Sequence, residues 1–338
     1  MAVPEASPRV VGFLQLARLL LNRTLQLGAQ ATPEEADENT PGLGSITSVR
    51  GAKLQTRRWD APSAPRALVV FCHGFGTQST HNQAWNRVAE LHVSHGLACA
   101  GIDYMGHGYS EGRRSRLESV ECVVDDLLQF IDEVLRPAFP APLPIFLRGQ
   151  SLGGIVALAA ALRRPELFSG LALGAPAFEL RWYTYPFAPR AITSGAADVR
   201  AKLSRLALPV ACFQGVEDTT VDPVGARHLI GALEGCQTRS LYLYVDMGHN
   251  MSIEPDVSEF LLARLDELHE GRAAAAVADG GPCGAVLKVR RPAAGVVWRQ
   301  PPPGSKDANV GTVVEVVEPA KQAEVLDELL KEECGVPL

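Results

Sequence analysis

The stretch 149–153 reads Gly-Gln-Ser-Leu-Gly, the GxSxG spacing of a nucleophilic serine held at a sharp turn. The residues before it form an apolar run typical of a buried strand, and an alanine-rich helical pattern follows it at once. A strand-to-helix turn of this kind strains the serine backbone, and side chains at Gly149 and Gly153 would collide with the neighbouring strand and helix. The pattern therefore predicts that Ser151 is a nucleophile whose hydroxyl stands above a sheet.

A serine hydroxyl is a poor nucleophile near pH 7, so the chemistry requires an imidazole to take its proton and a carboxylate to orient that imidazole. His249 follows an apolar strand pattern near the end of the series and is the candidate base. Asp218 follows the preceding strand pattern and is the candidate acid, with its neighbours Glu217 and Asp222 as the two alternatives. Nucleophile, acid and base would then follow one another along the chain in that order.

A second glycine-rich turn, His-Gly-Phe-Gly at 73–76, follows the apolar strand pattern at 67–72. Small residues there would let a backbone N–H face the reaction centre. The N–H groups of Phe75 and Leu152 are the predicted oxyanion hole, inferred from position, and losing one such donor typically costs about 3 to 4 kcal/mol of transition-state stabilisation. His73 and His107 lie in glycine-flanked turns, and we expect them to shape those loops rather than transfer protons.

The elements that must position these residues alternate along the chain between uninterrupted apolar strand patterns and helical patterns. Such alternation predicts an α/β fold with a mainly parallel sheet and helices on both faces, in which catalytic groups come from the carboxyl ends of the strands. The expected strands are at 45–60 (two, with a turn), 67–72, 97–103, 144–149, 170–174, 209–214 and 239–245. The expected helices are at 82–95, 120–135, 153–162, 224–233 and 257–269.

Composition excludes several classes of function. The 338 residues are 46% hydrophobic and 21% charged, which suits one large globular domain with an appendage. A net charge of -6 without a basic stripe argues against a nucleic-acid partner. The seven cysteines are scattered without a CxxC pair, so we expect reduced thiols, and no spacing suggests a metal site. We expect neither a cofactor nor a membrane-spanning helix.

Three parts are expected along the chain: an N-terminal helix and linker at 1–44, the main domain at 45–271, and an Ala/Gly/Pro-rich linker with a small strand and helix extension at 272–338. The helix at 10–27 has polar residues on one stripe and apolar residues around it. It could pack on the domain, lie in a membrane interface or serve as a targeting segment. We therefore expect a cytoplasmic or peripheral membrane protein, with organelle targeting as the remaining alternative.

Five motifs resemble those of the monoacylglycerol lipase branch of the α/β-hydrolases, a branch that includes plant-type lysophospholipases and caffeoylshikimate esterase. They are the turn at 73–76, the turn at 103–110, the nucleophile turn at 149–154, Asp218 with Val221 and Pro223, and the pair Gly248 and His249. The resemblance covers roughly residues 45–270. It implies the α/β-hydrolase fold, a triad of Ser151, Asp218 and His249, an oxyanion hole at Phe75 and Leu152, and no cofactor.

The chain departs from this branch at two places. Gln150 stands where the branch often has histidine or glutamate, which should affect local hydrogen bonding more than mechanism. Only about 30 residues, 179–208, occupy the place of a substantial helical lid, so we expect a short cap and a short or open acyl tunnel. The aromatic residues within it either line an acyl or aryl pocket or anchor the cap to the domain. They are Trp182, Tyr183, Tyr185 and Phe187.

The resemblance implies hydrolysis of a small-molecule or lipid ester through an acyl-enzyme on Ser151, with monoacylglycerol or lysophospholipid as the expected substrates. The short cap favours an alternative, an esterase for a soluble or aromatic ester similar to caffeoylshikimate esterase. A third reading is a binding protein that has the hydrolase fold but no activity. The intact set of Ser151, Asp218 and His249 counts against this third reading.

Overall fold

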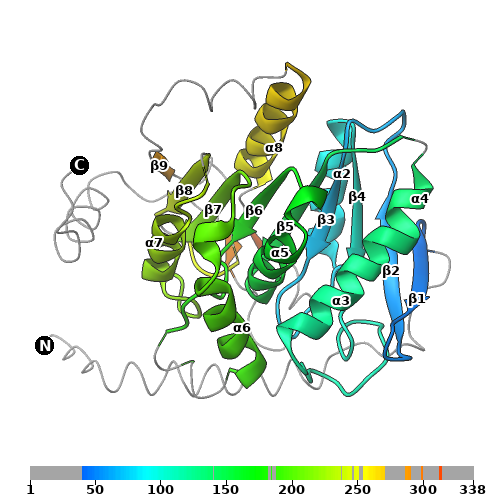
Figure 1. Ribbon diagram of the computed structural model, residues 1–338, viewed down its shortest axis with the longest axis horizontal. Helices are drawn as coiled ribbons and strands as arrows, with labels where there is room; N and C mark the ends of the chain where they lie inside the picture. The colour runs from blue at the N-terminus through cyan, green and yellow to red at the C-terminus, as the bar shows by residue number, and fades with distance from the viewer. Residues whose placement is uncertain are drawn as a thin grey trace, which may run out of the picture.

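The computed structural model describes residues 40–139, 141–181, 184, 188–236, 238–245, 247–250 and 254–270, together with the backbone of three short strands near the C-terminus (Figure 1). Three expectations lie outside the described residues: the N-terminal helix at 10–27, the helix of the C-terminal extension, and the aromatic cluster of the cap. That cluster comprises Trp182, Tyr183, Tyr185 and Phe187.

A single large sheet forms the centre of the molecule, with strand order β1-β2-β4-β3-β5-β6-β7-β8-β9. The strands from β4 to β9 run parallel to their neighbours, whereas β1 and β2 add an antiparallel edge. Their bounds are β1 (Leu43–Thr47), β2 (Lys53–Trp59), β3 (Ala67–Cys72), β4 (Leu97–Ile102), β5 (Ile145–Gln150), β6 (Gly170–Gly174), β7 (Val210–Gly215), β8 (Arg239–Tyr244) and β9 (Val286–Arg290). The predicted α/β class with a mainly parallel sheet is confirmed.

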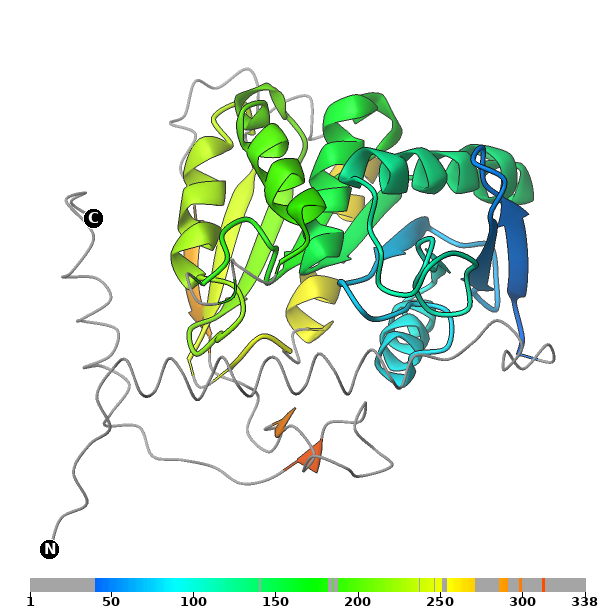
Figure 2. The same ribbon diagram turned by 90° about the horizontal axis from the view of Figure 1, so that it is seen from below.

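Helices cover both faces of the sheet (Figures 1 and 2). One face carries α3 (Val120–Phe130), α5 (Leu152–Arg163), α6 (Arg190–Arg200) and α7 (Pro223–Ala232). The other face carries α2 (Gln83–Ser94) and α8 (Glu254–His269). Because both faces are covered, all six residues of β3 and of β4 are buried, and their sequences are apolar without alternation.

Capping residues set the starts of two helices close to the predicted positions. The Asn82 side chain accepts a hydrogen bond from the N–H of Ala84 at the start of α2, and Ser119 accepts one from Cys122 at the start of α3. The helix expected at 120–135 continues from α3 through a π-helical turn at Ile131–Leu135 into the short α4 (Arg136–Ala138).

Sequence reasoning did not predict α6, which lies inside the stretch 179–208. This helix packs against α3 and α5 on the face of the sheet and connects the parallel neighbours β6 and β7. Parallel strands need such a crossover, because the chain must return to the starting end of the sheet before the next strand begins, and a tight turn joins only antiparallel strands. Much of 179–208 therefore serves as the crossover helix, and residues 175–189 make up the connection from the end of β6 to the start of α6.

The ninth strand comes from the segment beyond residue 271. β9 pairs in parallel with β8, with Leu287 opposite Leu241. Two further strands, β10 (Trp298–Arg299) and β11 (Thr312–Val313), pair with each other in a separate two-stranded sheet. The C-terminal extension thus contributes a strand to the main sheet.

Within the described residues, the structure also bears on three expectations about composition. The cysteines there are free thiols, and Cys72, Cys99 and Cys212 fill buried strand positions. No helix of the described part is both long enough and apolar enough to cross a membrane. The same residues contain no cluster of three or more His, Cys, Asp or Glu side chains suited to a metal ion.

The contact between α6 and α3 yields a stability prediction. A Cβ added at Gly195 would lie 2.3 Å from Cγ2 of Val120, so Gly195→Ala should overpack this contact and lower the free energy of unfolding by about 1 to 3 kcal/mol. Gly231→Ala in α7 is the matched control, because nothing lies within 4 Å of its added Cβ and alanine favours a helix. Urea unfolding measures both, and the added substitution Val120→Ala should recover part of the loss. A Gly195→Ala variant as stable as wild type would contradict the contact.

Candidate active site

Ser151 occupies the strained turn that its spacing predicts. It joins β5 to α5 with φ 54° and ψ -119°, outside the regions that residues other than glycine favour. A Cβ at Gly149 would lie 2.5 Å from the carbonyl oxygen of Gly153, and one at Gly153 would lie 1.8 Å from that of Cys72 in β3. The two glycines are therefore required by the close approach of strand and helix. The Ser151 N–H donates to the Gly174 carbonyl at 3.0 Å, which holds the turn to β6.

The structure brings two of the predicted residues into direct contact. Asp218 lies buried in the loop after β7, and its Oδ2 is 2.8 Å from Nδ1 of His249 in the loop after β8. Its Oδ1 accepts hydrogen bonds from the N–H groups of Thr220 at 2.8 Å and Val221 at 2.9 Å. An ionised carboxylate can only accept, so Nδ1 of His249 carries the proton and Nε2 keeps its lone pair.

The two alternative acids point elsewhere. Glu217 is exposed, and Asp222 accepts a hydrogen bond from the N–H of Val224 at the start of α7 and forms an ion pair with Arg181 at 3.5 Å. Of the three carboxylates that the sequence offered, Asp218 is the one bonded to His249.

Opposing effects act on the pKa of Asp218. Burial raises it, but the charge and hydrogen bond of His249 and the N–H groups of Val221 and Thr220 outweigh burial. The pKa of Asp218 is therefore lowered from its usual value, and the carboxylate is ionised across the neutral range.

The loop that carries His249 lies against the ends of β5 and β7. A Cβ at Gly215 would lie 2.2 Å from the Met247 carbonyl oxygen, and the side-chain amide of Gln150 donates to the His249 carbonyl at 3.1 Å. Among the described residues, Ser151 and His249 share no direct hydrogen bond. In free enzymes such bonds are often long and tighten only when substrate binds.

The predicted oxyanion donors flank the serine. A Cβ at Gly74 would lie 3.4 Å from Cβ of Ser151, so the turn containing Phe75 passes directly beside that serine. Leu152 is the first residue of α5, where an N–H has no acceptor within its own helix. The positive end of the α5 dipole also points to this place. The donor roles of Phe75 and Leu152 stay predictions.

A buried carboxylate holds the loop that contains Phe75. Oδ1 of Asp103 accepts from the N–H groups of Ser79 at 2.8 Å and Thr80 at 3.1 Å, and Oδ2 accepts from the Thr80 hydroxyl at 2.6 Å and the Tyr109 N–H at 3.2 Å. Burial raises the pKa of Asp103 against the effect of these hydrogen bonds. Sequence reasoning used the turn at 103–110 only as a mark of resemblance and missed this role.

The two histidines in glycine-flanked turns are neutral and shape their loops. Burial lowers the pKa of His73 to about 4 and that of His107 to about 4. His73 donates from Nδ1 to the Gly74 carbonyl at 2.7 Å and accepts at Nε2 from the Tyr104 N–H at 3.0 Å. Both ring nitrogens of His73 are engaged, as expected for a structural residue.

The segment after β6 is tied to the loop that carries Asp218, which the sequence did not indicate. The Arg181 N–H donates to the Thr220 carbonyl at 3.2 Å, and its guanidinium Nε donates to the Asp218 carbonyl at 3.2 Å. Through these two bonds, Arg181 restrains the loop that carries Asp218.

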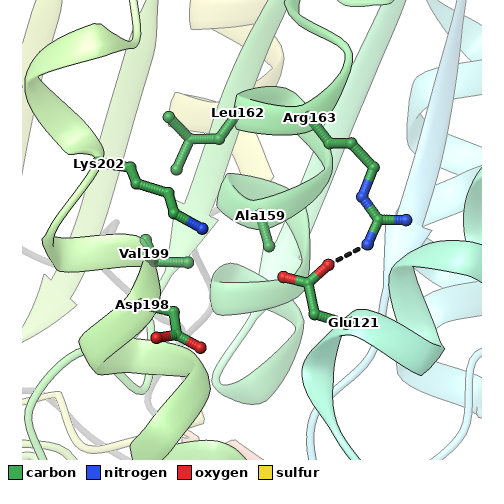
Figure 3. A pocket seen from close by; sticks show the side chains of 7 residues that line it. All are labelled: Glu121, Ala159, Leu162, Arg163, Asp198, Val199 and Lys202. Carbon is green, nitrogen blue, oxygen red and sulfur yellow. Dashed lines mark hydrogen bonds and ion pairs between the residues drawn. The ribbon is translucent and has the colours of Figure 1, made fainter.

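A hollow of about 160 Å³ lies between α3, α5 and α6 (Figure 3). Lys202, Asp198 and Glu121 reach into it, so its wall carries both signs of charge. Helix α5 borders the hollow with its carboxyl-terminal half, whereas Ser151 precedes the first residue of that helix. The hollow is therefore separate from the candidate site.

The lowered pKa of Asp218 makes a prediction about stability. Because the folded-state pKa lies below the unfolded one, ionised Asp218 contributes stability above about pH 4, and this contribution is lost as pH falls through the folded-state pKa. The difference in unfolding free energy between wild type and Asp218→Asn should therefore shrink on acidification from about pH 5 to pH 3. Denaturant titration at each pH measures it, with Asp198→Asn, an exposed carboxylate on α6, as control. Equal pH dependence of both variants would contradict the assignment.

Part of the chain is similar in sequence to known hydrolases. Residues 63–194 match the Hydrolase_4 family, described as serine aminopeptidase, S33. Human monoglyceride lipase is 31% identical over 149 residues, which are 44% of this chain and 48% of that protein. Caffeoylshikimate esterase of Arabidopsis thaliana is 32% identical over 114 residues, 33% of this chain and 34% of that one.

A solved structure extends the likeness over more of the chain. A soluble variant of monoglyceride lipase from Saccharomyces cerevisiae, in complex with a substrate analog, superposes with a TM-score of 0.58 at 19% identity, covering 69% of this chain and 96% of that one. At this identity the superposition establishes the fold. In sequence, the chain spans about half the length of the curated monoglyceride lipases it matches, or less. The chain therefore has the fold of the α/β-hydrolases and resembles in sequence, over less than half of its own length, the monoglyceride lipases.

Proposed function

We propose that this protein hydrolyses carboxylic esters, with Ser151 as nucleophile, His249 as general base and Asp218 as the acid that orients it. The observation that carries the proposal is the hydrogen bond between the buried Asp218 carboxylate and Nδ1 of His249, at the sheet edge where Ser151 stands in a strained turn. A protonated Nδ1 leaves Nε2 as the proton acceptor that a serine nucleophile requires.

In this mechanism, Nε2 of His249 takes the hydroxyl proton as Ser151 Oγ attacks the ester carbonyl carbon. The N–H groups of Phe75 and Leu152 would stabilise the oxyanion that forms. His249 then gives the proton to the leaving alcohol, and an acyl-enzyme remains on Ser151. Water repeats the sequence with the same base, which releases the acid and restores the hydroxyl.

Monoacylglycerols and lysophospholipids are the substrates we propose first. The support comes from similarity to monoglyceride lipases of human and mouse, to a monoglyceride lipase homolog of monkeypox virus and to a monoacylglycerol lipase of Mycolicibacterium smegmatis. Such substrates are held by burial of their acyl chains, and each buried methylene contributes about 0.8 kcal/mol. A helix at 10–27 that lies in a membrane interface would bring the enzyme to them, and we keep this contact as part of the proposal.

A soluble or aromatic ester is the second candidate, and one observation favours it. Helix α6 packs against α5 and α3, so we infer that the short connection at 175–189 is the part of this stretch that would cover the acyl group. A small cover buries fewer methylenes and lowers the advantage of a long chain. The similarity to caffeoylshikimate esterase is consistent with this candidate.

Covalent labelling tests the catalytic proposal. A fluorophosphonate probe should label the wild-type protein, and Ser151→Ala should abolish labelling and lower ester hydrolysis by about 10³-fold or more, because no other group replaces the nucleophile. Ser94→Ala, which alters an exposed hydroxyl at the end of α2, should label like wild type. An unlabelled wild-type protein would leave the noncatalytic binding protein as the remaining reading.

A chain-length series decides between the two substrate classes. With 4-nitrophenyl esters and monoacylglycerols of increasing acyl length, kcat/KM should rise by up to about fourfold for each added methylene that the site buries. A sharp preference for acetyl or aromatic esters would reject the lipid substrates and support the second candidate.

A further inference from the structure

Two glutamines at the carboxyl ends of β5 and β7, strands on either side of β6, bond directly to His249 and Asp218. Gln150 is the last residue of β5 and is half-buried, and Gln214 is the residue before the last in β7 and is fully buried. Neither has a role in the mechanism above. Both side chains make their bonds through the amide nitrogen, but to different parts of the pair Asp218 and His249.

Gln214 bonds to the carboxylate itself. Its Nε2 lies 3.1 Å from Oδ2 of Asp218 and 3.0 Å from the carbonyl oxygen of Gly215. Both partners can only accept, so the NH₂ group must face them and the amide orientation is determined by the site. The same Oδ2 accepts the bond from Nδ1 of His249.

The carboxylate is therefore saturated with donors. Oδ1 accepts from the N–H groups of Thr220 and Val221, and Oδ2 accepts from His249 and Gln214. A carboxylate offers about four acceptor positions, and four donors occupy them here. Each donor spreads part of the negative charge, so the donor from Gln214 weakens the attraction of Asp218 for a protonated imidazole.

Gln150 acts on geometry instead of charge. Its Nε2 donates to the main-chain carbonyl of His249 at 3.1 Å, so it does not touch the ring. Because Ser151 is the next residue in the chain, this bond connects the nucleophile turn to the backbone of the candidate base. It crosses from the end of β5 to the loop after β8, two segments that are not neighbours in the sheet.

We propose that Gln150 and Gln214 are positioning residues of the ester hydrolase, with separate effects: Gln150 places the imidazole against Ser151, and Gln214 sets the strength with which Asp218 holds the imidazolium. The inference rests on the proposed function, because it assigns roles around the same nucleophile, base and acid. A displacement of reacting groups by about 1 Å can cost 10²-fold in rate, which sets the scale for Gln150.

Methionine replaces glutamine at similar volume without the donor, so matched variants separate the two roles. Gln150→Met should lower kcat about 10-fold to 100-fold, with KM changed much less and the pH–rate profile unshifted. Gln214→Met should move the acid limb of the profile of kcat/KM to higher pH by about 0.5 to 1 unit, because a carboxylate with one donor fewer stabilises the imidazolium more. Gln129→Met is the control: it removes an amide that bonds to the Thr47 carbonyl away from the site.

A second variant at 214 keeps the test decisive if Gln214→Met folds poorly. Gln214→Glu places a second carboxyl about 3 Å from Asp218, and two carboxyls so close share one proton. Its pH–rate profile should then contain an ionisation that the wild type lacks. Thermal unfolding of each variant corrects its rate for the folded fraction.

The outcomes distinguish the positioning roles of the two glutamines from the proposed ester hydrolysis. If the wild-type full-length chain is not labelled and does not hydrolyse 4-nitrophenyl butyrate, the proposed function fails. If the wild type is active but Gln150→Met keeps its kcat, and neither variant at 214 alters the pH profile, the positioning roles are overturned while the function stands. A loss of rate in Gln214→Met without a change of pH profile in either variant would mean that Gln214 only supports folding.

Discussion

The approach of α5 to β3 leaves no room for a side chain at Gly153, whose Cβ would lie 1.8 Å from the Cys72 carbonyl oxygen. The chain therefore leaves β5 and enters α5 through a single residue, Ser151, held at φ 54°. Because β3 and β5 are parallel neighbours, the turn after β3 comes directly beside that serine. The next strands, β6, β7 and β8, follow in order and deliver Asp218 and His249 to the same edge. Close packing of one helix thus determines where Ser151 stands relative to Asp218 and His249.

Two buried carboxylates, Asp218 and Asp103, hold the loops at this edge. Their surroundings shift the two pKa values in opposite directions. Asp218 bonds to the imidazole of His249, whose side chain is 21% exposed, and the pKa of Asp218 is lowered despite burial. The partners of Asp103 are neutral hydroxyl and N–H groups, and burial raises its pKa. Hydrogen bonds alone therefore do not offset the desolvation of Asp103, whereas an ionisable partner does so for Asp218. This difference suits one carboxylate to act with a base and the other to organise a loop.

Helix α6 joins the layer of helices beside α3 and α5. Its glycine at 195 lets it approach α3 closely. Arg181, in the connection between β6 and α6, bonds to the carbonyls of Asp218 and Thr220, so this connection restrains the loop that carries Asp218.

The sequence by itself determined the parallel α/β fold, the strained turn at Ser151 and the order of the chemical groups, because these follow from apolar runs and glycine spacing that are local along the chain. It did not predict α6, since Thr193, Ser194 and Gly195 are weak helix formers and the helix is stabilised by burial against α3 and α5. Only the tertiary structure showed which of Glu217, Asp218 and Asp222 bonds to His249, and only it placed the amides of Gln150 and Gln214 on His249 and Asp218. The physical reason is that a hydrogen bond between the ends of two strands depends on the direction of the loops and on the strand register. Neither can be read from a local sequence in which several acidic residues lie close together.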